Sequence, residues 1–387
     1  MQAPPRPTDT RGPVDAARVA AELSRIQTFY PLLPTLGNRW AAHRPWEGMT
    51  IGLHLHITTL TACLVRELVL GGGRWIVSAA NSATTDLGVL DYLREMGISV
   101  YSGGGREDAV AETLDEEPDL FADVGFALGS AAIQRGQGIQ RGGIEITRSG
   151  VTKLRAMEPL PFPVLNINDG RLKPAVENRH GVGEGLWQAY TTLTGTHLAG
   201  HRVAVIGYGP VGAGVAAYAR AGGAQVEVFE MDPVRRLIAH YDGFATPPEP
   251  HMIRRAQIVV TATGKTHSLP TEIIRQCRDG VVLINAGHGA NEIDVAGLAR
   301  DAKGVDHVSP RVVRYRMPDG RHVVVLAQGN PLNIVMNSGS QEPVLLHFAL
   351  LGLGLEWLTR NTPTPGEIIL PDEIEQEAAR AALTVLA

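Results

Sequence analysis

Residues 203–233 read VAVIGYGPVGAGVAAYARAGGAQVEVFEMDP, and this stretch decides the fold of the chain. A short apolar run leads into the motif GYGPVG at 207–212, and the small residues after it predict a helix over 211–221. Two glycines end this helix, and a second apolar run ends at Glu230. A strand, a glycine turn, a helix, a second strand and an acid, in this order, are typical of a mononucleotide-binding unit.

Each glycine of the motif has a physical role in holding a pyrophosphate. Gly207 permits the tight turn, Gly209 lets backbone N–H groups approach the phosphates, and Gly212 lets the helix pack against the strand. The N-terminus of the helix adds partial positive charge. Glu230 lies 23 residues after Gly207, where a carboxylate binds both ribose hydroxyls and repels a 2′-phosphate. The stretch therefore predicts a dinucleotide site that takes NAD rather than NADP.

The composition of the 387 residues is that of an ordinary globular protein, with 44% apolar residues and a net charge of −5. The length suits two domains better than one core. No block of like charge indicates a nucleic-acid surface, so we expect no nucleic-acid partner. The two cysteines are too few for a disulfide framework or a metal knuckle. The N-terminus does not resemble a signal peptide and the longest apolar stretch is too short for a membrane span, so we expect a cytoplasmic protein without a membrane partner.

Strand and helix patterns alternate on both sides of the glycine motif. Residues 50–56 alternate as a strand and run into an apolar helix over 59–70. Further strands are expected at 75–80, 98–101, 164–168, 258–261, 281–285 and 322–327. Residues 106–155 show an acidic stretch and glycine-rich turns without a clear pattern, and the proline-containing stretch 363–371 has the composition of a linker. The repeated units predict an α/β fold, doubly wound, with helices on both faces of a parallel sheet.

The simplest assembly of these units has two domains. We expect a substrate and catalytic domain over residues 1–183, in which the proline-rich residues 1–13 are disordered. A Rossmann-type NAD domain over residues 184–338 is then inserted into this doubly wound α/β substrate domain. The C-terminal helices, over residues 339–387, return to the substrate domain.

Three segments outside the glycine motif carry polar residues at the ends of predicted strands, where open α/β sheets place their ligands. They are HLHIT at 54–58, NIND at 166–169 followed by Lys173, Glu177 and Asn178, and NAGH at 285–288. Each has a plain alternative, because a lysine and a glutamate four residues apart usually form a solvated ion pair. His54 and His56 share one strand face, but no third ligand is spaced to join them. We therefore expect no metal site and a packed His54.

With the glycine motif among them, these segments resemble S-adenosylhomocysteine hydrolase, and the resemblance runs from about residue 50 to about residue 360. The family's LHMT strand is LHIT at 55–58, its NVND…K…DN segment is NIND…K…EN at 166–178, and its GYGDVGKG loop is GYGPVGAG at 207–214. Its ITEIDP, NIGH…EID, DRYRLKNGR and EGRLVN motifs are VFEMDP at 228–233, NAGHGANEID at 285–294, VRYRMPDGR at 313–321 and QGNPLN at 328–333. So many motifs in one order make the kinship specific.

The resemblance implies a redox cycle without net oxidation, on NAD that is tightly bound and recycled. NAD takes a hydride from the 3′ carbon of a nucleoside, the resulting ketone acidifies the 4′ hydrogen, and loss of that proton eliminates the 5′ substituent. Lys173 would accept the proton of the 3′-hydroxyl, Glu177 would hold Lys173, and Asn178 would orient the sugar or the nicotinamide amide. His56 and His288 would serve the 5′ leaving group or water, since imidazole works near neutral pH.

The same resemblance assigns the remaining site residues. Those expected at the cofactor are Gly207, Gly209, Gly212, Glu230, Thr263, Asn285, Asn333 and Thr147. Those expected at the substrate are Thr58, Asn168, Asp123, Leu60, Ile146 and Ser340. The partner would be a nucleoside or a nucleoside-like small molecule. The resemblance also implies a homo-oligomer, either a dimer or a tetramer.

Departures from the family gather on the substrate side. Leu60 stands where the family has a glutamate that reads the adenine amino group, and Ile146 stands where it has a glutamate before a threonine triplet. The family's second aspartate of LDDGGD is Val124, after Asp123, and the histidine of its Gly-His-Pro turn is Ser340. Loss of a hydrogen-bonding group from a buried site changes selectivity by about 10²–10⁵-fold. We therefore expect a specialised nucleoside dehydratase or lyase, which oxidises at 3′ and eliminates at 5′.

Three other interpretations stay open. The chain could be a genuine S-adenosylhomocysteine hydrolase with a divergent pocket. A non-catalytic NAD-binding regulator is disfavoured because the catalytic positions keep their polar residues. A 2-hydroxy-acid dehydrogenase shares the inserted Rossmann layout, but it needs an arginine placed to bind a carboxylate, and the sequence does not identify one.

Overall fold

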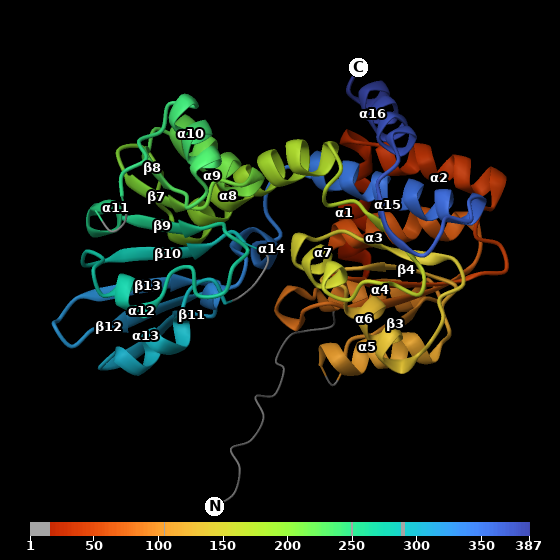
Figure 1. The fold of residues 1–387 in the computed structure, drawn as a ribbon, viewed down its shortest axis with the longest axis horizontal. Coiled ribbons are helices and arrows are strands. Elements are labelled where there is room, and N and C mark those ends of the chain that lie inside the picture. The colour runs from red at the N-terminus through yellow and green to blue at the C-terminus, as the bar shows by residue number, and fades with distance from the viewer. Residues whose placement is uncertain (1–15, 104, 249–250, 288–290) are drawn as a thin grey trace, which may run out of the picture.

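The computed structural model describes residues 16–103, 105–248, 251–287 and 291–387 and has two α/β lobes (Figure 1). A seven-stranded sheet forms the centre of each lobe. We call the lobe that holds β1–β6 and β14 the first lobe, and the lobe that holds β7–β13 the second lobe. Both sheets carry helices on two faces, so the predicted α/β fold class is confirmed. The expected disorder of residues 1–13 lies outside the described residues.

The first lobe has a parallel sheet with the strand order β14-β6-β5-β4-β1-β2-β3. Its strands are β1 (Thr50–Leu55), β2 (Arg74–Ala79), β3 (Ser99–Tyr101), β4 (Leu120–Asp123), β5 (Gly142–Glu145), β6 (Pro163–Asn166) and β14 (Gly366–Ile369). One face is covered by α1 (Ala16–Phe29), α2 (Leu32–His43), α3 (Thr59–Leu68), α4 (Leu87–Glu95), α15 (Glu342–Arg360) and α16 (Asp372–Leu386). The other is covered by α5 (Arg106–Asp115), α6 (Ala127–Arg135) and α7 (Arg148–Arg155).

The second lobe has the strand order β11-β12-β13-β10-β9-β7-β8. Its strands are β7 (Arg202–Ile206), β8 (Gln225–Phe229), β9 (Ile258–Thr261), β10 (Val281–Asn285), β11 (Gly304–Ser309), β12 (Val312–Arg316) and β13 (His322–Leu326). Its helices are α8 (Val182–Thr194), α9 (Pro210–Ala221), α10 (Pro233–Tyr241), α11 (His251–Arg255), α12 (Thr271–Ile274), α13 (Val295–Asp301) and α14 (Leu332–Met336). Strand β12 pairs antiparallel with both of its neighbours, so this edge is a meander beside an otherwise parallel sheet.

Two stretches of the first lobe differ from the sequence-based expectation. Residues 106–155, which showed no pattern, contain α5, β4, α6, β5 and α7. The expected linker over 363–371 contains β14, which pairs parallel with β6 at the sheet edge. Both strands of the unclear region are short and buried on both faces, and β14 is half-buried on both, so none of them shows alternation of apolar and polar residues.

The chain passes between the lobes twice. The first crossing is a π-helix, η3 (Lys173–Gly181), which continues directly into α8. The second crossing runs from α14 through residues 337–341 into α15. The described residues also contain three short 3₁₀ helices: η1 (Val69–Gly71), η2 (Ser82–Thr84) and η4 (Ala327–Gly329). Among the helices of the described residues, none has the length and apolar character that a membrane crossing requires.

Candidate active site

The glycine motif forms a cradle between β7 and α9 that fits a pyrophosphate. Gly207 has a φ of +100°, and a Cβ there would lie 2.6 Å from the carbonyl oxygen of Ala262. A Cβ on Gly212 would collide with the carbonyl oxygen of Gly207, so a glycine is needed here for α9 to pack closely on β7. At Gly209 a Cβ would meet only the flexible end of Arg235, 3.6 Å away, so the backbone is open toward a ligand. Pro210 begins the helix, where its missing N–H costs nothing.

Glu230 lies directly after β8 and is fixed against the cradle. One of its carboxylate oxygens accepts a hydrogen bond from the backbone N–H of Tyr208 at 2.7 Å, and the other accepts one from Asp232 at 2.9 Å. The carboxylate is therefore held beside the glycine motif, where the ribose of a dinucleotide lies in this kind of fold. Its negative charge disfavours a 2′-phosphate at the same place.

The carboxyl ends of β9 and β10 add further polar groups to this edge. Thr263 donates through its backbone N–H and its hydroxyl to Glu292, both at 2.9 Å. Asn285 is buried, donates to the carbonyl of Gly329 at 2.8 Å and accepts from the N–H of Gly287 at 2.7 Å. The sequence motifs did not predict Glu292 as a site residue, although it lies inside the NEID segment.

Asn333, on α14, has a buried amide oxygen without a hydrogen-bond partner among the described residues. A buried acceptor without a partner costs about 1–3 kcal/mol, so a ligand donor is the natural way to satisfy it. A nicotinamide carboxamide offers such a donor. Together with the glycine cradle and Glu230, this atom shows that the residues present fit NAD.

Lys173 begins the π-helix η3 and is 8% exposed. Its ammonium donates to the carboxylate of Glu177 at 2.6 Å and to the amide oxygen of Asn178 at 3.1 Å. In a π-helix, whose hydrogen bonds run from i to i+5, residues four and five positions apart share one face. The local helix type thus brings both partners to the lysine. The side chains of Lys173 and Glu177 are 9% and 17% exposed, so the pair is largely shielded and is not the solvated surface pair of the plain alternative.

His56 follows β1 and contacts Thr84 through its Nδ1, at 2.7 Å from the threonine hydroxyl. That hydroxyl donates its single hydrogen to the carbonyl of Asn81 at 3.0 Å, so it accepts from His56. Nδ1 therefore carries the hydrogen, and Nε2 carries the lone pair. Burial and, secondly, the nearby charge of Arg106 lower the pKa of His56 to about 4. The imidazole is therefore neutral at physiological pH, and its Nε2 carries a lone pair.

His54 lies two residues before His56, within β1, and is fully buried. Its Nδ1 contacts the hydroxyl of Ser78 at 3.0 Å, and its Nε2 accepts from the guanidinium of Arg106 at 3.2 Å. Burial lowers the pKa of His54 to about 3. The described residues contain no group of three or more His, Cys, Asp or Glu side chains that could hold a metal ion.

Asp123 and Glu145 are neighbours across β4 and β5 and are both fully buried. Burial raises the pKa of Asp123 to about 6 and that of Glu145 to about 8, the latter also because of the charge of Asp123. Glu145 accepts from the N–H of Phe126 at 2.7 Å and from the hydroxyl of Thr147 at 2.6 Å. Thr147 caps α7, so its hydroxyl is engaged in holding these loops.

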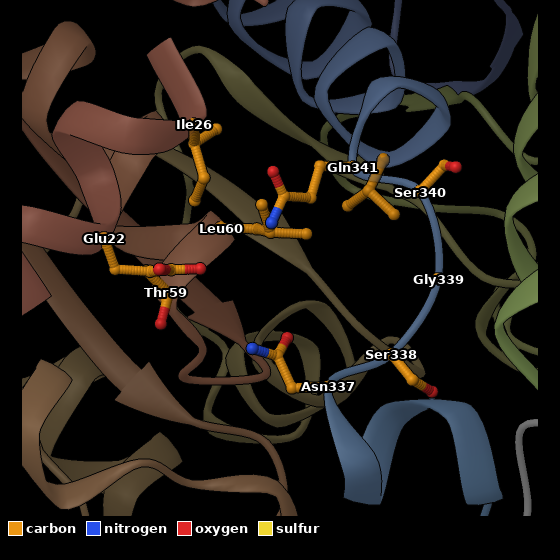
Figure 2. Close-up of a pocket in the computed structure, with 10 residues that line it drawn as sticks. Glu22, Ile26, Thr59, Leu60, Asn337, Ser338, Gly339, Ser340 and Gln341 are labelled. Carbon is orange, nitrogen blue, oxygen red and sulfur yellow. The ribbon is translucent and has the colours of Figure 1, made fainter. Parts of the chain in front are cut away.

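The expected substrate residues lie in two groups. Leu60 and Ser340 line one pocket, between α1, the start of α3 and residues 337–341 (Figure 2). Ile146 and Asp123 are buried at the ends of neighbouring strands. The others are anchored locally: Thr58 caps α3, and Asn168 donates to Asp169 at 2.7 Å.

His288 lies outside the described residues. The sequence motifs also did not predict Arg106 as a site residue, although a charged residue directly after the glycines at 103–105 could have indicated one. Its guanidinium donates to His54 and to the carbonyl of Val124, so it joins the ends of β1 and β4.

Comparison with known proteins agrees with this geometry. The profile of the S-adenosyl-L-homocysteine hydrolase NAD binding domain matches residues 178–339. The adenosylhomocysteinase of Thermotoga maritima is 33% identical over 379 residues, which cover 94% of this chain and 94% of the relative. That of Pyrobaculum aerophilum is 32% identical over 404 residues, covering 95% and 92%. The S-inosyl-L-homocysteine hydrolase of Methanopyrus kandleri is 33% identical over 368 residues, covering 91% and 87%.

Proposed function

The chain belongs to the S-adenosyl-L-homocysteine hydrolase family and binds NAD, and from this premise we propose that it is a specialised nucleoside dehydratase. It oxidises the 3′-hydroxyl of a nucleoside transiently and eliminates the 5′ substituent as water. The observation that carries the proposal is a contrast between the expected catalytic residues and the expected base-binding residues. The hydrogen-bonded Lys173–Glu177–Asn178 group, with its buried lysine, and the neutral His56 are present, whereas Leu60 and Ile146 replace hydrogen-bonding carboxylates of the family.

When bound, NAD supplies reversible removal of hydride from the 3′ carbon, so the cycle needs no external oxidant. Lys173 passes one of its own protons to Glu177, which lies 2.6 Å away, and the resulting neutral amine then accepts the 3′-hydroxyl proton. Asn178 fixes the direction of the lysine through its amide oxygen. Lys173 is buried and its two partners are partly buried, so the group is largely shielded from solvent.

The ketone at C3′ acidifies the hydrogen at C4′, and His56 is suited to remove it. The hydrogen bond to Thr84 places the hydrogen on Nδ1 and leaves the lone pair on Nε2. After Nε2 takes the C4′ proton, the C4′ electron pair forms the 4′,5′ double bond and the C5′–O bond breaks. The imidazolium returns the same proton to the departing oxygen, so water leaves and His56 is neutral again. Reduction of the ketone then gives a 4′,5′-unsaturated nucleoside without net oxidation.

The test is incubation of the holoenzyme with a panel of nucleosides, followed by mass spectrometry. We expect transient NADH absorbance and a product that is lighter by one water. NADH absorbance with unchanged mass in every case would instead indicate oxidation without elimination, and would refute the dehydratase proposal.

A second candidate is genuine hydrolysis of S-adenosylhomocysteine or of a related thioether nucleoside. The observation that favours it is the 33% identity with relatives named adenosylhomocysteinase and S-inosyl-L-homocysteine hydrolase. In this case water adds to the unsaturated intermediate before reduction. Incubation with S-adenosylhomocysteine or S-inosylhomocysteine and a thiol reagent separates the two, because steady release of homocysteine establishes the hydrolase.

The expected organisation stays part of the proposal. We propose a substrate domain over 1–183, an NAD domain over 184–338, and C-terminal helices over 339–387 that complete the first domain. We also propose a cytoplasmic homo-oligomer. Size-exclusion chromatography with light scattering tests the oligomeric state directly.

A further inference from the structure

A carboxylate on α1 faces the pocket in which Leu60 has replaced the family's glutamate. The pocket is bordered by the first turn of α3 and by the segment that leads into α15 (Figure 2). Its lining residues are Glu22, Ile26, Thr59, Leu60, Asn337, Ser338, Gly339, Ser340, Gln341 and Val344. Among these, Glu22 alone carries a charge. Leu60 itself offers no polar atom on its side of the pocket.

The tertiary contacts of α1 hold Glu22 in place. Val19, Leu23 and Ile26 are buried against the first-lobe core, with at most 1% of each exposed. Two further contacts attach the helix to its neighbours: Arg18 pairs with Asp86 at the start of α4, and Gln27 donates to Glu67 of α3 at 2.8 Å. A side chain at position 22 therefore projects from a fixed backbone.

Arg25 orients the carboxylate and leaves part of it available. Its Nη2 and Nε donate to the two oxygens of Glu22 at 2.6 and 3.0 Å. A carboxylate has about four lone-pair positions, so two acceptor positions stay open after a bidentate contact with arginine. The Glu22 side chain is 36% exposed, so a ligand in the pocket can reach it.

We infer that Glu22 is a specificity-determining residue, which reads the base of the substrate by accepting a hydrogen bond from an N–H donor on its edge. The inference rests on the proposed function and deepens it. The family contact with the base amino group has moved from the α3 position, now Leu60, to α1. The chain would then select bases that carry an exocyclic amine or a ring N–H, and reject bases without a donor there.

The test compares binding of three nucleosides to the holoenzyme by calorimetry. Adenosine carries an exocyclic amine, inosine carries a ring N–H, and purine riboside has the same ring and sugar without either donor. A hydrogen bond to a charged group contributes about 1.5–3 kcal/mol, which is about 10–150-fold in Kd. We expect the wild type to prefer the better of adenosine and inosine over purine riboside by at least about tenfold. In Glu22→Ala this preference should fall to about twofold or less.

Glu22→Gln, which keeps an acceptor oxygen, should retain an intermediate preference. Glu95→Gln removes one exposed charge from the neighbouring helix α4 and is the matched control, with the preference unchanged. Thermal unfolding checks that each variant is folded. An unchanged preference in Glu22→Ala, or none in the wild type, overturns the inference, while transient NADH absorbance together with a product lighter by one water leaves the proposed function standing. Absence of both binding and NADH absorbance with every nucleoside overturns both.

Discussion

The hydrogen bond between Thr84 and His56 offers a selective way to impair elimination without affecting oxidation. Replacement of Thr84 by Val keeps the shape of the side chain and removes its hydroxyl. The Nδ1–H of His56 then loses the hydroxyl acceptor that lies 2.7 Å away. Thr84 is only 7% exposed, so water does not easily replace this acceptor. The hydrogen bond that places the hydrogen on Nδ1 is then lost, so Thr84 no longer selects the tautomer with the lone pair on Nε2.

The size of the effect follows from the cost of that orphaned donor. A buried polar group without a partner costs about 1–3 kcal/mol. If this cost appears in the transition state of elimination, the rate falls by about 5–150-fold, because 1.36 kcal/mol corresponds to a factor of ten. Lys173 and its two partners are not touched by the substitution, so the oxidation at C3′ should keep its rate within about twofold.

Single-turnover experiments separate the two steps. The rise of NADH absorbance reports oxidation, and quenched-flow mass spectrometry reports loss of the 5′ substituent. Thr84→Ser, which restores the hydroxyl, should recover most of the elimination rate and serves as the control. Equal slowing of both steps in Thr84→Val would show that the threonine only supports the fold, and an unchanged elimination rate would refute the assignment of His56 as the base.

Three further predictions address the proton acceptor, the cofactor and the buried imidazoles. Lys173→Met should slow transient NADH formation by about 10²–10⁴-fold, whereas Lys303→Met, at an exposed position, should not change it. Glu230→Ala should weaken NAD binding and narrow the preference for NAD over NADP, which titration of the apoprotein with both nucleotides measures. His54 has a folded-state pKa of about 3, below its unfolded value of about 6.5, so its contribution to stability is present above pH 6.5 and is lost as the pH falls. Between pH 7 and pH 4.5 the wild type should therefore lose about 2–3 kcal/mol more unfolding free energy than His54→Asn, as urea titrations report; an equal loss contradicts the assigned pKa.

The buried acids oppose this pH dependence, which is why the comparison needs a variant. The pKa values of Asp123 and Glu145 are raised in the folded protein, to about 6 and about 8. Such groups bind more protons in the folded state, so their contribution favours folding at low pH and is lost as the pH rises through the folded pKa. Both acids are present in wild type and in His54→Asn, so the comparison of the two proteins reduces their effect on the difference.

The second lobe was the most predictable part of the fold because its signals are local. The apolar run before the glycine motif is β7, and the small-residue helix is α9, within one or two residues of the expected bounds. Glycines with positive φ or with no room for a Cβ are recognisable wherever they occur. By contrast, β14 is a strand only because β6 offers its edge, more than 190 residues earlier in the chain, and no local pattern records that pairing.

The candidate site likewise has a part that is visible in the local sequence and a part that depends on tertiary structure. Lys173, Glu177 and Asn178 come together within one helical turn, so their spacing is visible in the sequence and only the π-helical geometry was unforeseen. The pocket that Glu22 and Leu60 line instead joins α1, α3 and the segment before α15, whose residues are far apart in the chain. A carboxylate can leave position 60 and be replaced from α1 without any trace in the motif that contained it. The substitution at Leu60 therefore indicates a changed pocket from the sequence, but only the tertiary structure shows that Glu22 faces it.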